Sequence, residues 1–106
     1  MAYYLVRATL KPERADILRE QLEKGTIRNL QPFGRALTYS LEHARWNPET
    51  GEAVWEEEDY CSPPLAQERS SVLDTYFEDI RIHPVSPGEG WEHIKQYPSL
   101  WRVLTE

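Results

Sequence analysis

The chain has 106 residues and a formal net charge of −6. This length predicts a single domain, 1–106, with one hydrophobic core. The acidic balance argues against nucleic acid and against an anionic membrane as the main partner. The single cysteine, Cys61, excludes an intrachain disulfide and a multi-cysteine metal site. No apolar run reaches the roughly 20 residues of a membrane helix, and no signal peptide is recognised, so we expect a cytoplasmic protein.

The first two elements are predicted from side-chain periodicity. Residues 2–9 are rich in β-branched and aromatic side chains, which is typical of a strand. Pro12 suits the first turn of a helix, where its missing N–H is harmless. Apolar residues then recur at helical spacing, so residues 13–24 are predicted as an amphipathic helix that ends at Gly25.

A β-hairpin is predicted in the middle of the chain. Residues 34–46 alternate between apolar and polar side chains, which indicates a second strand. The segment Asn47-Pro48-Glu49-Thr50-Gly51 follows, and asparagine, proline and a closing glycine are typical of a turn. Residues 52–61 then return as the third strand.

The second half of the chain contains a helix, a strand and an aromatic segment. Residues 62–64, Ser-Pro-Pro, have the composition of a helix start, and apolar spacing predicts a helix over 65–77. A short fourth strand is expected at 80–85. The aromatic-rich segment 91–104 is predicted to be partly helical, with a break at Pro98.

The predicted order is β-α-β-β-α-β, which favours an α+β fold with a four-stranded antiparallel sheet and both helices on one face. Over residues 2–86 this order resembles the ferredoxin-like fold, and residues 87–106 are left as a C-terminal aromatic helical appendage. More narrowly, it resembles the dimeric α+β barrel proteins, which include cofactor-free monooxygenases, isomerases, lyases and YCII-like proteins. The resemblance implies central first and third strands, a homodimer with its open sheet faces together, and no cofactor.

The helix-free face of the predicted sheet is where a site would lie. We assign the more apolar side of each strand to the helices, because burial of apolar side chains stabilises the fold. The opposite side of the first, second and fourth strands then carries Tyr3, Leu5, Arg7, Thr38, Ser40, Glu42, Arg81 and His83.

The third strand is ambiguous, because a slip of one residue moves every side chain to the other face. Two sets of residues can face outward. The turn favours the first of these two sets, which are Trp55, Glu57, Asp59 and Cys61, or Val54, Glu56, Glu58 and Tyr60.

Five residues are therefore the candidates for a small-molecule site on this face. His83 would be the general acid or base, because the ordinary pKa of histidine is about 6.5. Arg7 would hold an anionic organic ligand by a bidentate contact. Asp59 would orient His83 or balance Arg7, while Tyr3 and Trp55 would line the site. A simple ion pair between Arg7 and Asp59 would account for both residues without a ligand.

Two other features allow more than one interpretation. In the run 56–59, two carboxylates on one face could bind Mg²⁺ or force one pKa upward, or the run could simply keep a strand edge soluble. Cys61 precedes a predicted helix start, which lowers a thiol pKa, but a lone cysteine is more often a small buried apolar residue. Without a closed set of Cys and His ligands, we expect no metal.

These features lead to two functional hypotheses. The first is a small homodimeric protein with a small-molecule pocket on the helix-free face, where it uses cofactor-free acid–base chemistry if it is an enzyme. The alternative is a non-catalytic protein-interaction module that uses the open sheet face and the tryptophan-rich C-terminal segment around Trp91 and Trp101.

Overall fold

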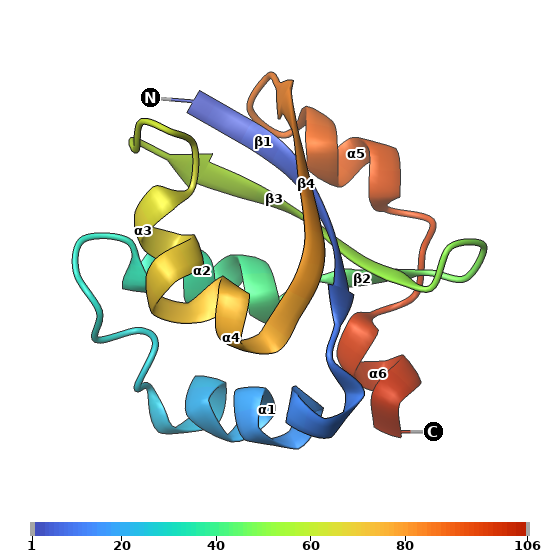
Figure 1. Cartoon of the computed structure of the whole chain (residues 1–106). Coiled ribbons are helices and arrows are strands. Elements are labelled where there is room, and N and C mark those ends of the chain that lie inside the picture. Colours follow the sequence, from blue (N-terminus) through green and yellow to red (C-terminus); the bar gives the residue numbers. More distant parts are fainter. Residues whose placement is uncertain (1, 106) are drawn as a thin grey trace.

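A four-stranded antiparallel sheet runs through the computed structural model, which describes residues 2–105 (Figure 1). The strands are β1 (Ala2–Leu10), β2 (Arg45–Asn47), β3 (Glu52–Asp59) and β4 (Phe77–Val85), in the spatial order β2-β3-β1-β4. The predicted α+β class and four-stranded antiparallel sheet are confirmed. β1 and β3 are the two central strands, so their side chains determine what each face of the sheet carries.

The register between β1 and β3 corrects the preferred interpretation of the third strand. Trp55 lies directly opposite Val6, and Glu57 lies opposite Tyr4. Val6 is fully buried in the core, so Trp55, Glu57 and Asp59 face the helices and not the open side. The turn itself was predicted correctly, since Asn47 pairs with Glu52. The error arose because residues 34–42, whose polar side chains were used to choose the face, form no strand.

Residues 34–42 form the helix α2 (Gly34–Glu42), where the sequence predicted a strand. Leu37 and Leu41 lie four residues apart, a spacing that places them on one side of a strand or of a helix alike. Both are fully buried. Gly34 allows the helix to begin close to the preceding segment, because a Cβ there would lie 2.4 Å from the carbonyl oxygen of Ile27.

Helix α2 covers the part of β3 that β2 leaves without a strand partner. β2 pairs only as far as Val54. Beyond that point Ser40 Oγ donates a hydrogen bond of 2.8 Å to the carbonyl oxygen of Glu56. An uncovered strand edge promotes aggregation, so this helix protects the sheet. Thr38, Ser40 and Glu42, which were expected on the open face of a strand, therefore belong to a helix beside the sheet edge.

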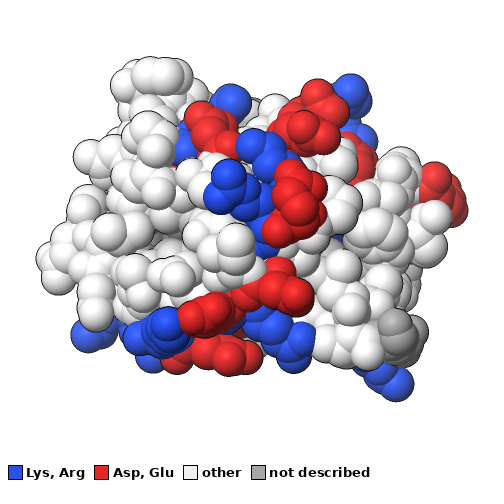
Figure 2. All heavy atoms as spheres, turned by 60° about the horizontal axis from the view of Figure 1, so that its bottom comes forward, with Lys and Arg blue, Asp and Glu red and all other residues white. Residues whose placement is uncertain are grey.

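The predicted first helix is confirmed as the 3₁₀ turn η1 (Pro12–Arg14) followed by α1 (Ala15–Lys24). Leu18 and Leu22 face the core, and Gly25 ends the helix in the left-handed conformation at φ 79°. Figure 2 views the molecule from the side of α1, where positive and negative side chains are intermixed. Two of the ion pairs on α1 join residues four apart, Arg19 with Glu23 and Glu20 with Lys24, as on an ordinary solvated helix face.

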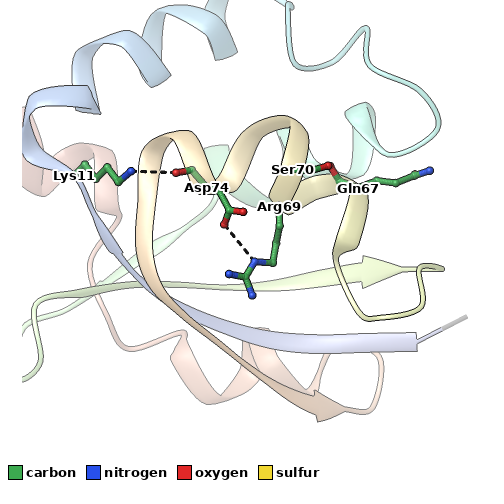
Figure 3. Close-up of polar contacts among 5 residues, drawn as sticks. All are labelled: Lys11, Gln67, Arg69, Ser70 and Asp74. Carbon is green, nitrogen blue, oxygen red and sulfur yellow. Dashed lines mark hydrogen bonds and ion pairs between the residues drawn. The ribbon is translucent and has the colours of Figure 1, made fainter.

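The predicted second helix is a continuous helical segment of three parts. These are α3 (Ala66–Glu68), the π-helical η2 (Arg69–Leu73) and α4 (Asp74–Tyr76). Figure 3 shows how side chains fix it: Lys11 Nζ donates to the carbonyl oxygen of Asp74 at 3.0 Å, and Arg69 Nε lies 3.3 Å from the Asp74 carboxylate. The segment is thereby tied to the start of the first helical region, and it holds Glu68 in a fixed position above the sheet.

The C-terminal segment is part of the core and not an appendage. Its helices are α5 (Glu89–Ile94) and α6 (Leu100–Thr105), on either side of the predicted break at Pro98. α5 lies on the face of the sheet opposite α1 to α4, so helices cover both faces and not one (Figure 1). The backbone of residues 98–100 bonds to that of residues 44–46, and Leu100 is fully buried.

A buried carboxylate anchors α5 to the sheet. Glu56 accepts hydrogen bonds from the backbone N–H of Gly88 at 2.9 Å and of Gly90 at 2.7 Å. A Cβ at position 90 would lie 2.9 Å from Glu56 Oε1, so this close approach requires glycine. None of the helices in residues 2–105 has the length and apolar character needed to cross a bilayer.

Candidate functional site

The five predicted site residues lie on opposite faces of the sheet. Arg7, His83 and Tyr3 are on the face that was predicted to be helix-free, which α5 covers in part and which keeps the name helix-free face below. On this face Arg7 Nη2 lies 3.1 Å from His83 Nε2. Asp59 and Trp55 are on the helix-covered face, where Trp55 packs against Phe77 with ring centroids 5.1 Å apart. The expected meeting of Arg7 and His83 is therefore seen, whereas the expected participation of Asp59 and Trp55 at that site is wrong.

Asp59 instead lies beside Glu68 and Cys61. Asp59 is the last residue of β3, Cys61 follows in the connection, and Glu68 is the last residue of α3. One ligand atom from each of the three side chains lies within 4.8 Å of the other two. Asp59 and Glu68 expose only 2% and 1% of their surface. The chain thus places two carboxyl groups and a thiol together between the sheet and the helical segment.

The backbone between β3 and α3 fixes the orientation of Asp59. Leu65 takes the left-handed conformation at φ 61°, which is uncommon for a residue other than glycine. Its buried side chain holds it there, and its backbone N–H donates to Asp59 Oδ2 at 2.6 Å. The left-handed turn therefore has a clear result: it directs an amide hydrogen at a carboxylate and favours the ionised form of that group.

The two carboxyl groups have opposite pKa shifts. Burial opposes ionisation of Asp59, but the hydrogen bonds from Leu65 and Glu68 outweigh it and lower the pKa of Asp59 below its ordinary value. Burial raises the pKa of Glu68 to about 7, with a further contribution from the hydrogen bond to Asp59 and its charge. Below about pH 7 the pair consequently shares one proton, which Glu68 carries and donates in a hydrogen bond to Asp59.

The environment of the neighbouring acid Glu57 favours its neutral form. It is 0% exposed, and its Oε1 atom accepts a hydrogen bond of 3.1 Å from the indole N–H of Trp55. Burial, followed by the charge of Glu68, raises the pKa of Glu57 well above its ordinary value. Burial therefore disfavours a further negative charge beside the Asp59–Glu68 pair.

Cys61 is not activated as a nucleophile. Its thiol donates to Glu68 Oε1 at 3.6 Å. A backbone hydrogen bond at Gln67 favours the thiolate, but burial and the neighbouring carboxylates Asp59 and Glu68 outweigh it and raise the pKa of Cys61. Since the thiolate is the reactive form, the thiol serves here as a weak hydrogen-bond donor to the carboxyl pair.

A pocket of about 260 Å³ opens next to this pair. One wall comes from the segment before α2 and from α2 itself, and the other from the end of β3 and from α3. Most of the surface that its lining residues expose to the pocket is apolar. The residues that line it are Pro32, Phe33, Arg35, Ala36, Glu58, Asp59, Tyr60, Cys61, Gln67 and Glu68.

The carboxyl pair and the thiol could also hold a divalent cation. Three donor atoms are enough for a cation that keeps an open coordination position. However, a proton shared between Asp59 and Glu68 already neutralises one of the two charges. The same groups can act without a cation as a proton-transfer pair, in which Asp59 stabilises the position of the proton on Glu68.

Glu68 was missed by sequence reasoning, although a signal for it exists. It lies three residues after Leu65 and four before Val72, so it shares the apolar side of the predicted helix. An acid at a buried helical position is rare unless it has a partner. Comparisons of this chain with family models, curated proteins and solved structures find no match.

Proposed function

We propose that the protein binds a small organic molecule in the pocket beside Asp59 and Glu68 and transfers a proton to or from it. The carboxyl pair is the acid–base group of this reaction. One observation carries the proposal: two buried, hydrogen-bonded carboxyls form part of the wall of a mostly apolar pocket. The small-molecule site expected on the helix-free face is thereby moved to the helix-covered face.

The protonation state of the pair suits acid–base chemistry near neutral pH. A general acid or base works best when its pKa lies close to the working pH. The pKa of Glu68 is raised to about 7, first by burial. Glu68 therefore exchanges its proton readily, while Asp59 remains ionised and receives the hydrogen bond. The apolar lining strengthens this effect, because little water competes for the charges.

The alternative, a protein-interaction module built on the tryptophan-rich C-terminal segment, has less support. Trp101 donates its indole N–H to the carbonyl oxygen of Leu41 at 2.7 Å. Trp91 lies edge-on to Tyr39, with ring centroids 6.3 Å apart. Both tryptophans pack against the core of their own chain. They are consequently not free anchors for a partner, although hot spots in interfaces require such anchors.

The test uses 5-nitrobenzisoxazole, a neutral planar probe for a base in an apolar pocket. A carboxylate removes its ring C–H proton, the electron pair forms a nitrile, and the N–O bond breaks to give a coloured phenolate. We expect the wild type to accelerate this reaction, with a rate that rises as pH passes through about 7 and Glu68 ionises. Glu68→Gln should lower the rate on the order of 10²-fold.

Two further variants make this test decisive. Glu92→Gln changes an exposed acid on α5, outside the pocket, and should leave the rate unchanged. Ala36→Phe should fill the pocket and block the reaction while the carboxyl titration, followed by ¹³C NMR, stays visible. If the wild type and Glu68→Gln react equally fast, or both only at the rate of the buffer, the proposal is wrong.

We also propose, on the resemblance to dimeric α+β barrel proteins with a ferredoxin-like fold, that the chain forms a homodimer. The half-exposed residues Tyr3, Leu5 and Val85 lie on the part of the helix-free face formed by β1 and β4, and a partner would cover them. Sedimentation equilibrium at micromolar concentrations should show the dimer mass. A well-folded monomer under these conditions would contradict it.

A further inference from the structure

Two arginines face each other directly on the helix-free side of the sheet. Arg7 on β1 pairs in register with Arg81 on β4, so their side chains leave the sheet on the same face. Side chains opposite each other in an antiparallel pair lie about 5 Å apart at Cβ, and like charges there are destabilising. This arrangement is unfavourable unless something negative lies between the two guanidinium groups.

Residues 2–105 supply no carboxylate that forms an ion pair with the guanidinium group of Arg7 or of Arg81. Glu56, which faces the same side from β3, has both carboxylate oxygens engaged by the N–H groups of Gly88 and Gly90. Glu78, which follows on β4, is exposed. The buried Nε atom of Arg7 also has no hydrogen-bond partner among the described residues.

His83 fixes the orientation of Arg7. Arg7 Nη2 lies 3.1 Å from His83 Nε2, and a guanidinium only donates hydrogen bonds. His83 therefore accepts with Nε2 in this contact. The hydrogen bond holds one corner of the Arg7 fork and leaves its other N–H groups directed elsewhere. A fork that is held in place loses less conformational entropy when it binds an oxyanion.

We propose that Arg7, Arg81 and His83 form a binding site for a small oxyanion, namely a phosphate or carboxylate group, on the helix-free face of the sheet. Arg7 and Arg81 bind the oxygens of the anion, and His83 is a positioning residue for Arg7. The site is independent of the carboxyl pair, because Asp59 and Glu68 lie on the helix-covered side of the same sheet. An anion here removes the repulsion between the two arginines and stabilises the pairing of β1 with β4.

The experiment measures thermal unfolding in a low-salt buffer titrated with sodium phosphate, sodium acetate or sodium chloride at matched ionic strength. We expect a saturable rise in the melting temperature of the wild type with phosphate or acetate, but not with chloride. The response to phosphate alone identifies a phosphate group, and the response to acetate alone identifies a carboxylate. The imidazole NMR signals of His83 should shift with the same saturation curve.

Arg81→Ala provides the decisive variant, because Arg81 is exposed and its truncation leaves the core intact. Without the anion this variant should melt at the wild-type temperature or above it, since the repulsion with Arg7 is gone. Its dissociation constant for the anion should be weaker by on the order of tenfold, as expected for losing a charge-assisted contact.

Arg14→Ala is the matched control. It removes the same charge from an exposed arginine of η1, so it should keep the wild-type response to the anion. His83→Gln retains a hydrogen-bond acceptor and should retain most of the response. The proposal is overturned if neither anion gives a saturable shift, or if Arg81→Ala responds as strongly as the wild type.

Discussion

The two faces of the sheet differ in how their charged side chains are compensated. The helix-covered face buries three acids, Glu57, Asp59 and Glu68, with no basic residue bonded to them among the described residues. The helix-free face carries Glu56 and Glu58 as well as Arg7 and Arg81, but neither arginine forms an ion pair with a carboxylate among residues 2–105. Burial raises the pKa of Glu57 and of Glu68, so bound protons reduce the negative charge of the acidic cluster. An arginine stays charged, so the facing pair of Arg7 and Arg81 favours an anionic ligand.

This difference follows from strand geometry. Successive residues of a strand point to opposite faces, so neighbouring residues enter different environments. In β3, Glu57 and Asp59 point toward the helices, whereas Glu56 and Glu58 point the other way. The run of four acids therefore separates by face. Glu57 and Asp59 are buried toward the helices, while Glu56 anchors α5 and Glu58 lies at the edge of the pocket. One sequence pattern thus has several structural roles.

The largest expected effect tests which face Trp55 occupies. Trp55→Ala removes a fully buried indole from the helix-covered face and should lower the free energy of unfolding by about 3–5 kcal/mol. Leu5→Ala, at a half-exposed position of the helix-free face, is the control and should have a smaller effect. Urea denaturation measures both. Equal small effects would mean that the third strand has the opposite register.

The second prediction concerns Glu56, the carboxylate on the helix-free face that accepts hydrogen bonds from two backbone N–H groups. Glu56→Ala removes the acceptor for the N–H groups of Gly88 and Gly90, and should lower the free energy of unfolding by about 3 kcal/mol. Hydrogen exchange should speed up in α5. The matched variant Glu89→Ala, at an exposed position, should have a much weaker effect. A stability unchanged by Glu56→Ala would show that α5 is held by other contacts.

The third prediction is a pH dependence that arises on the helix-covered face. Because the pKa of Glu68 is raised from 4.5 to about 7, the folded state binds more protons than the unfolded state between these values. The free energy of unfolding should therefore fall as pH rises from about 4.5 to about 7. Since one pKa unit corresponds to about 1.4 kcal/mol, the expected loss is a few kcal/mol.

Glu68→Gln is the variant that checks this origin. The substituted side chain cannot ionise, so the free energy of unfolding of the variant should change less over the same pH range. Above about pH 7 the variant should have lost less of its low-pH stability than the wild type has. Urea denaturation at several pH values measures the curves. If Glu68→Gln and the wild type have parallel curves, the pair does not hold its proton as described.

The smallest expected effect is the response to chelation. Since a shared proton already reduces the charge of the Asp59–Glu68 pair, folding should not need a cation. Thermal melts with and without EDTA should coincide. A large drop in melting temperature with EDTA would show that the acidic side of the sheet is completed by a metal and not by a proton.

Local patterns in the sequence determined the elements whose signals are local. The strand at the start of the chain, the helix after Pro12, the turn at residues 47–51 and the helical segment before β4 are all present. Each is encoded by side-chain periodicity over a few turns, or by residues whose own backbone preferences select the turn. Arg7 and His83 could also be placed on one face, because the alternation within β1 and β4 is unambiguous.

Tertiary structure decided the rest. Leu37 and Leu41 fit a strand or a helix equally well, and only packing beside the unpaired edge of β3 selects the helix. Because the predicted strand at residues 34–46 was used to choose the face of Asp59, the error in that strand also placed Asp59 on the wrong face. Asp59 at the end of β3 and Glu68 at the end of α3 are brought together by the turn at Leu65. Whether Glu68 keeps its proton depends on its burial. Burial and non-local contact are properties of the folded chain, and no local pattern contains them.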